Sequence, residues 1–352
     1  TAATTLGQNT WSLSGQTLSS SNTLKVRVLD TAGNAGTALS QAYVLDTTAP
    51  STTIATVALS ADTGTSTSDF ITRTAAQTIS GTTSAALQSG EIVQVSLDNG
   101  ATWATATTTT GQNTWSLAGQ TLSGSDTLQV RVADTAGNTS AATSQAYVLD
   151  TTAPTTTVAT VALSADTGTS TSDFITRTAA QTLSGTTSAA LQSGEIVQVS
   201  LNNGTTWTTA TTTLGQNTWS LNGTLSGSNT LKVRVLDAAG NTGASTSQAY
   251  VLDTTAPTTT IATVALSADT GTSATDFITK TAAQTLSGTT SAALQSGEIV
   301  QVSLDNGTTW TTAAAAVGQN TWSLGGQTLA GSDTLQVRVA DAAGNTSTVV
   351  SK

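Results

Sequence analysis

The sequence predicts an all-β protein built from tandem antiparallel β-sandwiches, and three observations support this prediction. The string Val-Leu-Asp-Thr-Thr-Ala-Pro occurs three times, and its Asp lies at positions 46, 150 and 253, which are 104 and 103 residues apart. Within each repeat apolar and polar residues alternate, and no segment has the periodicity of an amphipathic helix. A repeat of about 100 residues is the length of a whole domain rather than of a solenoid coil.

The repeated Asp marks the predicted domain boundaries. We expect full modules at 46–149, 150–252 and 253–352, preceded by a partial module at 1–45 that matches only the back half of a full one. All three prolines of the chain lie in the repeated string. Proline fixes its own φ and keeps the preceding residue out of the helical region, so we expect an extended linker at each boundary.

The alternation within the first full module predicts its strands. It is clearest over 93–97 and 128–132, where Val and Leu alternate with polar residues. Turn residues separate further strand candidates at 53–59, 69–73, 76–82, 101–107, 113–117 and 140–146. About seven short strands in a domain of this size indicate an antiparallel sandwich of immunoglobulin type. The expected fold is therefore a linear rod of tandem immunoglobulin-like antiparallel β-sandwiches.

A tight hairpin is predicted between two of these strands. Asp98, Asn99 and Gly100 separate two alternating runs, and the Asn-Gly pair favours the positive φ angles that two-residue hairpin turns require.

Aromatic residues recur at fixed places and suggest how each core is filled. The full modules contain tryptophan pairs twelve residues apart: Trp103 and Trp115, Trp207 and Trp219, Trp310 and Trp322. Such a pair could form a sugar-binding platform, but we favour a core otherwise made of Val, Leu and Ala. Tyr147 and its counterparts lie three residues before the boundary Asp, and we expect them to close the last strand onto that core.

Composition argues against several functional classes. The chain has 20 acidic and 10 basic residues, for a net charge of −10, with no basic cluster to neutralise phosphates, so we expect no nucleic-acid partner. It has no run of 18 apolar residues, so we expect no membrane insertion in this segment. Cys and His are both absent. This excludes Ser-His and Cys-His nucleophiles and soft-ligand zinc sites, and we do not expect an enzyme.

Acidic residues instead point to calcium at the poles of the sandwiches. Loops of a seven-stranded antiparallel sandwich alternate between its two poles, and four oxygen-bearing positions fall at the pole next to the entering linker. In the three full modules they are Asp46, Glu91, Asp134 and Asn138; Asp150, Glu195, Asp237 and Asn241; Asp253, Glu298, Asp341 and Asn345. Converging carboxylates repel one another, and a Ca²⁺ ion with six to eight oxygen ligands would remove that repulsion.

A second acidic group lies at the opposite, exit pole of each module. It consists of the two acids that bound an Asp-Thr-Gly loop: Asp62 and Asp69, Asp166 and Asp173, Asp269 and Asp276. Because an exit pole faces the entry pole of the next module, neighbouring modules of the same chain could share ions and fix their angle. Each acid also has a simpler explanation, as a turn-forming or solvated loop residue.

Three motifs resemble a known family. Val-Arg-Val-x-Asp-x-Ala-Gly-Asn at 130–138, the Leu-Asp-x-Thr-Ala-Pro boundary and Asp-Thr-Gly…Asp-Phe-Ile-Thr resemble bacterial immunoglobulin-like repeats. Such repeats form the extender regions of giant RTX-type, biofilm-associated and ice-binding surface adhesins. The resemblance implies type I secretion, location on the bacterial cell surface, and Ca²⁺ that makes the module junctions rigid. It also implies calcium ligands among the boundary Asp, the Glu that opens the third strand and the Asp of Asp-x-Ala-Gly-Asn.

The sequence thus predicts structural extender repeats that project a terminal adhesive domain for cell or surface attachment or biofilm formation. A surface or glycan ligand would then bind through domains outside this segment. The alternative is that the repeats themselves bind glycan or matrix, or associate laterally into an extracellular filament or surface layer, since edge strands invite pairing.

Overall fold

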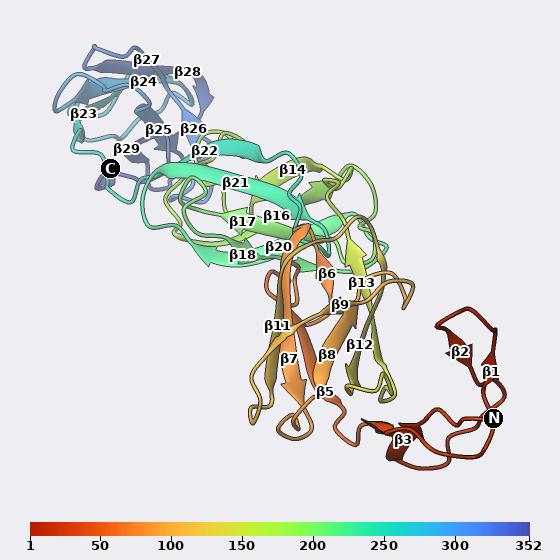
Figure 1. Ribbon diagram of the computed structural model, residues 1–352. Helices are drawn as coiled ribbons and strands as arrows, with labels where there is room; N and C mark the ends of the chain where they lie inside the picture. The colour runs from red at the N-terminus through yellow and green to blue at the C-terminus, as the bar shows by residue number, and fades with distance from the viewer. The chain divides into compact units, whose positions relative to one another are not determined.

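The computed structural model describes residues 1–352, and every regular element in it is a β-strand (Figure 1). The predicted all-β fold of tandem immunoglobulin-like sandwiches is confirmed. No helix is present that could cross a membrane. The chain divides into two compact units, Thr1–Thr152 and Ala153–Lys352, which are described separately.

The first 45 residues form two small antiparallel sheets without a core. Strand β1 pairs with β2, and β3 pairs with β4. Their bounds are β1 Ala3–Thr4, β2 Trp11–Ser12, β3 Asn22–Val26 and β4 Leu39–Tyr43. Leu24 is 51% exposed, whereas Leu128, at the same place in the first full module, is completely buried. A two-stranded sheet has no second layer to cover its apolar face.

The first full module is a sandwich of two sheets. Its strands are β5 Ile54–Leu59, β6 Ile71–Thr72, β7 Ala76–Thr83, β8 Ile92–Ser96, β9 Ala104–Thr105, β10 Thr107–Thr108, β11 Thr114–Thr121, β12 Asp126–Ala133 and β13 Thr143–Leu149. One sheet has the order β10-β11-β7-β5 and the other β6-β13-β12-β8-β9. All pairs are antiparallel except β6 with β13. Each predicted segment overlaps an observed strand, but 101–107 divides into β9 and β10, which lie in different sheets.

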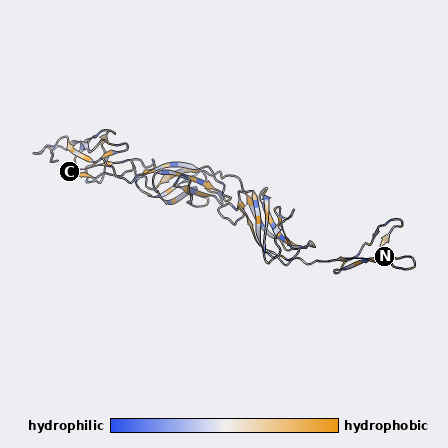
Figure 2. Cartoon of the chain, turned by 60° about the vertical axis from the view of Figure 1, so that its left-hand side comes forward, coloured by the Kyte–Doolittle hydropathy of each residue, from blue (hydrophilic) through white to orange (hydrophobic).

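The core of this module lies between the two sheets. Inward residues such as Val93 and Val130 are fully buried, and Trp115 and Tyr147 are nearly so. Figure 2 shows the alternation of hydrophobic and hydrophilic residues along the strands that produces this core. The Tyr147 hydroxyl donates to the carbonyl of Leu97 at 2.9 Å, as expected for a residue that closes the last strand onto the core.

The second unit contains two further modules of the same design. The first has β14 Val158–Leu163, β15 Ile175–Thr176, β16 Ala180–Thr187, β17 Ile196–Ser200, β18 Thr208–Thr209, β19 Thr211–Thr212, β20 Thr218–Thr224, β21 Asn229–Leu236 and β22 Thr246–Leu252. The next has β23 Ile261–Leu266, β24 Ala283–Thr290, β25 Ile299–Ser303, β26 Thr311–Thr312, β27 Ala314–Ala315, β28 Thr321–Thr328, β29 Gln336–Ala340 and β30 Val350–Ser351. In this last module no strand corresponds to β6, and β30 is two residues long. Ile278, at the position of Ile71, is 66% exposed.

Two backbone features shape every full module. Asn99 and Gly100 have the predicted positive φ angles of 53° and 88° in a turn closed by the Ala101 N–H and the Asp98 carbonyl at 3.1 Å, but β8 and β9 pair only from Val95 and Ala104, so the connection is longer than the predicted tight hairpin. Gly81 lies where β7 passes a register shift in β5, and a Cβ atom there would overlap the carbonyl oxygen of Thr56 and lie 2.8 Å from the Trp115 ring. The core tryptophan therefore packs directly on a strand backbone that only glycine can provide.

Candidate metal sites at the module poles

At the entry pole, the Asp-x-Ala-Gly-Asn hairpin is held together by its own carboxylate. Asp134 Oδ1 accepts hydrogen bonds from the backbone N–H groups of Ala136 and Asn138, both at 2.9 Å. Its Oδ2 accepts from Asn138 Nδ2 at 2.9 Å. These bonds, the one from the Asn138 side chain above all, lower the pKa of Asp134. The Asp237–Asn241 and Asp341–Asn345 pairs have the same side-chain bond.

The Asn of this hairpin also contacts the linker. Asn138 Nδ2 donates to the main-chain oxygen of Asp46 at 3.1 Å, and Asn345 Nδ2 donates to that of Asp253 at 2.9 Å. The linker carboxylates accept from the backbone two residues further on, as Asp46 does from Thr48 at 3.0 Å. Asp150 and Asp253 form the same turn.

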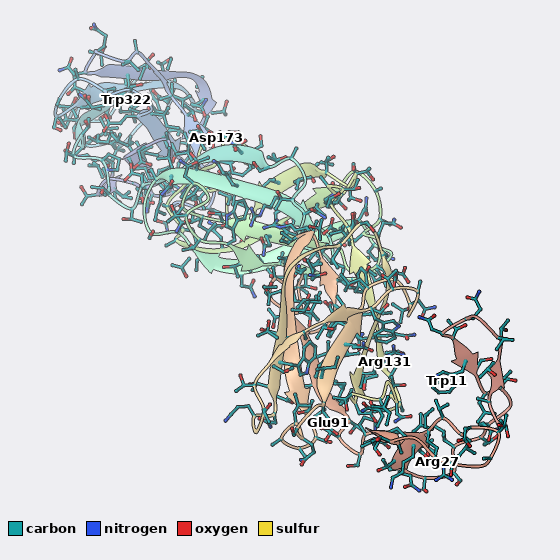
Figure 3. All side chains as sticks on the ribbon, viewed as in Figure 1. Trp11, Arg27, Glu91, Arg131, Asp173 and Trp322 are labelled. Atoms are coloured by element: carbon teal, nitrogen blue, oxygen red, sulfur yellow. The ribbon has the colours of Figure 1, made fainter.

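The predicted Glu ligand lies in a turn beside the hairpin. Glu91 Oε2 accepts from the Gln88 N–H at 2.8 Å, and Glu195 and Glu298 are bound in the same way. A Cβ atom on the preceding Gly90 would lie 2.8 Å from the Thr135 side chain, so the turn and the hairpin are in contact. Figure 3 labels Glu91 at this pole.

These contacts bring the entry-pole segments together without assembling a ligand set. Each carboxylate for which bonds are described accepts from N–H groups of its own segment. No group of three or more His, Cys, Asp or Glu side chains is placed so that it could hold a metal ion. Calcium ligation by the entry-pole acids therefore stays a prediction.

The exit-pole loop has a different arrangement. Asp62 Oδ2 accepts from the Phe70 N–H at 2.9 Å, and Asp69 Oδ1 accepts from the Ile71 N–H at 3.0 Å. Phe70 has a φ of 62°, a left-handed conformation that is rare for a bulky residue. The Asp62 carboxylate thus stabilises an unfavourable bend that leads into β6.

The second oxygen of this carboxylate has no partner. Asp62 Oδ1 is buried and accepts no hydrogen bond, and the same holds for Asp166 Oδ1 and Asp269 Oδ1. Burial raises the pKa of Asp62, and the nearby Asp69 carboxylate raises it further. Asp166 is affected by burial and Asp173 in the same way. An unpartnered buried carboxylate oxygen costs free energy, and a hard cation is the ligand that relieves this cost.

The unpartnered oxygen distinguishes the loop acids from the entry-pole acids, but they too form no group of three or more acidic side chains, so calcium ligation by them also stays a prediction. The sequence shows that Asp62 and Asp69 are seven residues apart, but it does not show the unpartnered carboxylate oxygen that distinguishes this loop. The N–H of Phe70, the residue with the left-handed conformation, donates to Oδ2 of Asp62, while Oδ1 of Asp62 is buried without a partner. A Phe directly after the second Asp is the only signal in the sequence.

The first tryptophan of each pair lies outside the core, contrary to the prediction. Trp103 is half-buried on the outer face, and the Arg131 guanidinium stacks 3.8 Å from its ring centroid. Arg131 Nε donates to Gln94 Oε1 at 3.0 Å, and Trp103 Nε1 donates to the Gly100 carbonyl at 3.0 Å. Arg234 and Arg338 stack on the rings of Trp207 and Trp310 in the same way. A ring covered by Arg is a poor sugar platform.

Comparison with known proteins places the repeats in a family. A family model described as "Bacterial Ig-like domain" matches residues 48–151, 152–254 and 255–351. The chain belongs to the bacterial Ig-like domain family. Its three full repeats are thus tandem bacterial Ig-like modules, as the resemblance of the motifs predicted.

Several solved structures resemble this run of bacterial Ig-like modules. A Ca²⁺-stabilised adhesin that helps an Antarctic bacterium bind ice is 26% identical, with 95% of this chain and 81% of that chain covered and a TM-score of 0.28. Domains A168–A170 of titin are 11% identical over 83% and 95% of the two chains, with a TM-score of 0.29. The BSP domain of a biofilm-associated protein is 10% identical over 84% and 65%, with a TM-score of 0.18. TM-scores this low carry no argument about function. No curated protein matches significantly.

Proposed function

We propose that these modules are structural extender repeats of a bacterial surface adhesin, in which Ca²⁺ makes the module junctions rigid. The rod would project a terminal adhesive domain outside this segment for cell or surface attachment or biofilm formation. Membership of the bacterial Ig-like family supports this proposal, as do the near-identical copies. An extender gains length from each added copy, whereas a catalyst gains little.

The observation that carries the calcium proposal is the unpartnered carboxylate oxygen. It occurs at the same place in all three full modules, on Asp62, Asp166 and Asp269. In each copy a second acid, Asp69, Asp173 or Asp276, ends the same loop. A site with only oxygen donors, and without Cys or His, favours Ca²⁺ over transition-metal ions.

The residues of this loop would hold the ion and transmit its effect. Bound Ca²⁺ supplies the positive charge that the carboxylate pair lacks. The Asp62 carboxylate would then link the loop to the Phe70 backbone without the cost of its bare oxygen. The loop would open less often, and the pole on which the next module follows would be stiffer.

The modules would act outside the cell, at the bacterial surface, with neighbouring modules of the same chain as their direct partners. Glycan binding by the modules themselves is the weaker alternative, because Arg131, Arg234 and Arg338 cover the candidate tryptophan faces.

Calcium titration of the full chain tests this function. We expect Ca²⁺ to raise the melting temperature and to bind in isothermal titration calorimetry, because the ion binds the folded loops and not the unfolded chain. Replacing Asp62, Asp166 and Asp269 together with Asn should abolish most of this gain. Asp98→Asn is the matched control, because Asn202 already occupies its place in the next module. A melting temperature that is the same in Ca²⁺ and EDTA would overturn the proposal.

A further inference from the structure

The junction between the last two modules, which lie in one compact unit, is held by direct hydrogen bonds. Thr167 Oγ1 donates to the Ala343 carbonyl at 2.8 Å, and the Thr169 N–H donates to the Ala342 carbonyl at 3.3 Å. The Arg177 guanidinium donates to the Gly344 carbonyl. Every donor belongs to the exit pole of one module, and every acceptor is a main-chain carbonyl of the next module's Asp-x-Ala-Gly-Asn hairpin.

Two glycines permit this close approach. A Cβ atom on Gly168 would overlap the Ala342 carbonyl oxygen, and one on Gly344 would overlap the Thr167 carbonyl oxygen. Gly344 has a φ of 85°, so the hairpin turn also requires it. Gly168 has no positive φ, and the strongest overlap it avoids is with the neighbouring module. The glycine of Asp-Thr-Gly is therefore explained by the junction.

The hairpin presents its carbonyls in a fixed orientation. Asp341 Oδ1 accepts from the Asn345 N–H at 2.9 Å, and the Asp341 backbone N–H donates to the Asn345 carbonyl at 3.0 Å. These bonds close the loop from inside and leave the carbonyls of residues 342–344 directed to the outside. A rigid row of acceptors loses little entropy when donors bind it.

We propose that the exit pole formed by Thr167, Gly168, Thr169 and Arg177 is an interaction surface for the main chain of the following module's Asp-x-Ala-Gly-Asn hairpin. We call this contact between the exit pole and the hairpin the lock. The lock rests on the proposed extender function, which it would serve by holding neighbouring modules together, but its hydrogen bonds need no metal ion. The surface recognises carbonyl groups, so it tolerates different residues within the hairpin. Those residues are Thr135-Ala136, Ala238-Ala239 and Ala342-Ala343 in the three full modules.

The last module carries an equivalent surface, with Lys280 in place of Arg177, and Gly271 within it is near atoms of its own loop only. Thr270 and Gly271 are exposed there, whereas Thr167 and Gly168 are half-buried. A Cβ atom on Gly271 would meet only atoms of its own loop, the nearest being the Ile278 oxygen at 3.0 Å. This surface supplies matched controls, because its variants change the same loop without touching a junction.

Distance measurements on the full chain test the lock. The chain has no cysteine, so Thr209→Cys and Thr312→Cys, at exposed and equivalent strand positions, would place one spin label in each of the two modules. Double electron–electron resonance then reports the spread of the distance between them. We expect a distribution that is already narrow in EDTA, because the hydrogen bonds form without metal, and that Ca²⁺ narrows further. Gly168→Val should broaden it in both solutions, and Gly271→Val should leave it narrow.

A second variant keeps the test decisive if Gly168→Val disturbs its own loop. Arg177→Ala removes one donor at the edge of the contact and should shift or broaden the distribution, while the matched Lys280→Ala should not. A distribution that is narrow only in Ca²⁺, or one that neither Gly168→Val nor Arg177→Ala alters, would overturn the lock. The calcium proposal is decided separately by calorimetry. Absence of Ca²⁺ binding with a narrow distribution in EDTA would refute calcium and support the lock.

Discussion

At the scale of single residues, similar acids have opposite environments. Asp98 accepts from the Ser96 hydroxyl and from the backbone and hydroxyl of Thr102, so its charge is well satisfied. Asp62 has one oxygen bonded and the other buried without a partner. The sequence shows both simply as loop acids. Their roles depend on which N–H and O–H groups the folded backbone turns toward them, and spacing alone does not determine this.

The Asp98 environment predicts an acid-dependent contribution to stability. Hydrogen bonds from Ser96, and then from Thr102, lower the pKa of Asp98 from 3.8 to about 2. The pKa of Asp305 is lowered to about 2 by the corresponding bonds, those from Thr309 being the largest. A lowered folded-state pKa stabilises the protein above the unfolded value, and this stabilisation is lost as the pH falls through the folded value.

Replacing both Asp98 and Asp305 with Asn should therefore lower the free energy of unfolding near neutral pH, and the loss should become progressively smaller between pH 3.8 and about 2. Urea unfolding in EDTA at a series of pH values measures the difference between variant and parent. A difference that does not change with pH would show that these bonds do not depend on charge.

A glycine packed against a tryptophan gives a second prediction at this scale. Gly81→Ala places a methyl group against the Thr56 carbonyl and the Trp115 ring. Overpacking of this kind costs about 1–3 kcal/mol of unfolding free energy. Gly124→Ala is the control, because nothing lies within 4 Å of a Cβ atom there. Equal urea midpoints for the two variants would contradict the tight packing.

At the scale of elements, the strands follow directly from the sequence, because a period of two buries one face of a sheet. Contacts between side chains on neighbouring strands are harder to predict from the sequence. The alternation around Arg131 places it on the outer face, but nothing along the chain indicates that Trp103 lies beneath it. That contact depends on β9 lying beside β8, which is a matter of sheet order rather than local pattern. For this reason the sequence assigned Trp103 to the core.

The Arg–Trp stack predicts a specific change in fluorescence. Arg131→Ala uncovers the Trp103 ring and should increase quenching by acrylamide, with a loss of about 0.5–1 kcal/mol of stability. Arg27→Ala is the control, because residues 1–45 contain no counterpart of Trp103. Unchanged quenching in Arg131→Ala would mean that the guanidinium does not cover the ring.

At the scale of the whole molecule, repetition predicted the modular design, and each full module has its own hydrophobic cluster. Local packing faults should therefore remain within one module. The sequence predicted that an exit pole faces the next module's entry pole, but not which groups of the exit loop and the hairpin form hydrogen bonds. Thr167, Gly168 and Arg177 have no pattern that distinguishes a joint from an ordinary loop until the next module is placed beside them.

The separate cores predict how a buried cavity affects the full chain. Leu183→Ala removes a completely buried side chain from the core cluster of the second full module and should cost about 2–5 kcal/mol there. Differential scanning calorimetry should show one transition moved to a lower temperature while the others stay in place. Leu214→Ala is the control, because that side chain is 68% exposed. A uniform shift of all transitions would mean that the modules unfold as one unit.

The choice of main-chain carbonyls as the acceptors at the joint has a consequence for how such a chain can evolve. Duplication, deletion or exchange of whole modules by recombination brings together neighbours that have never met, and a joint that depended on matched side chains would fail at each new boundary. A joint that needs only the shape of a five-residue hairpin does not depend on such matching. The length of the chain can therefore change in steps of one module while each junction still forms.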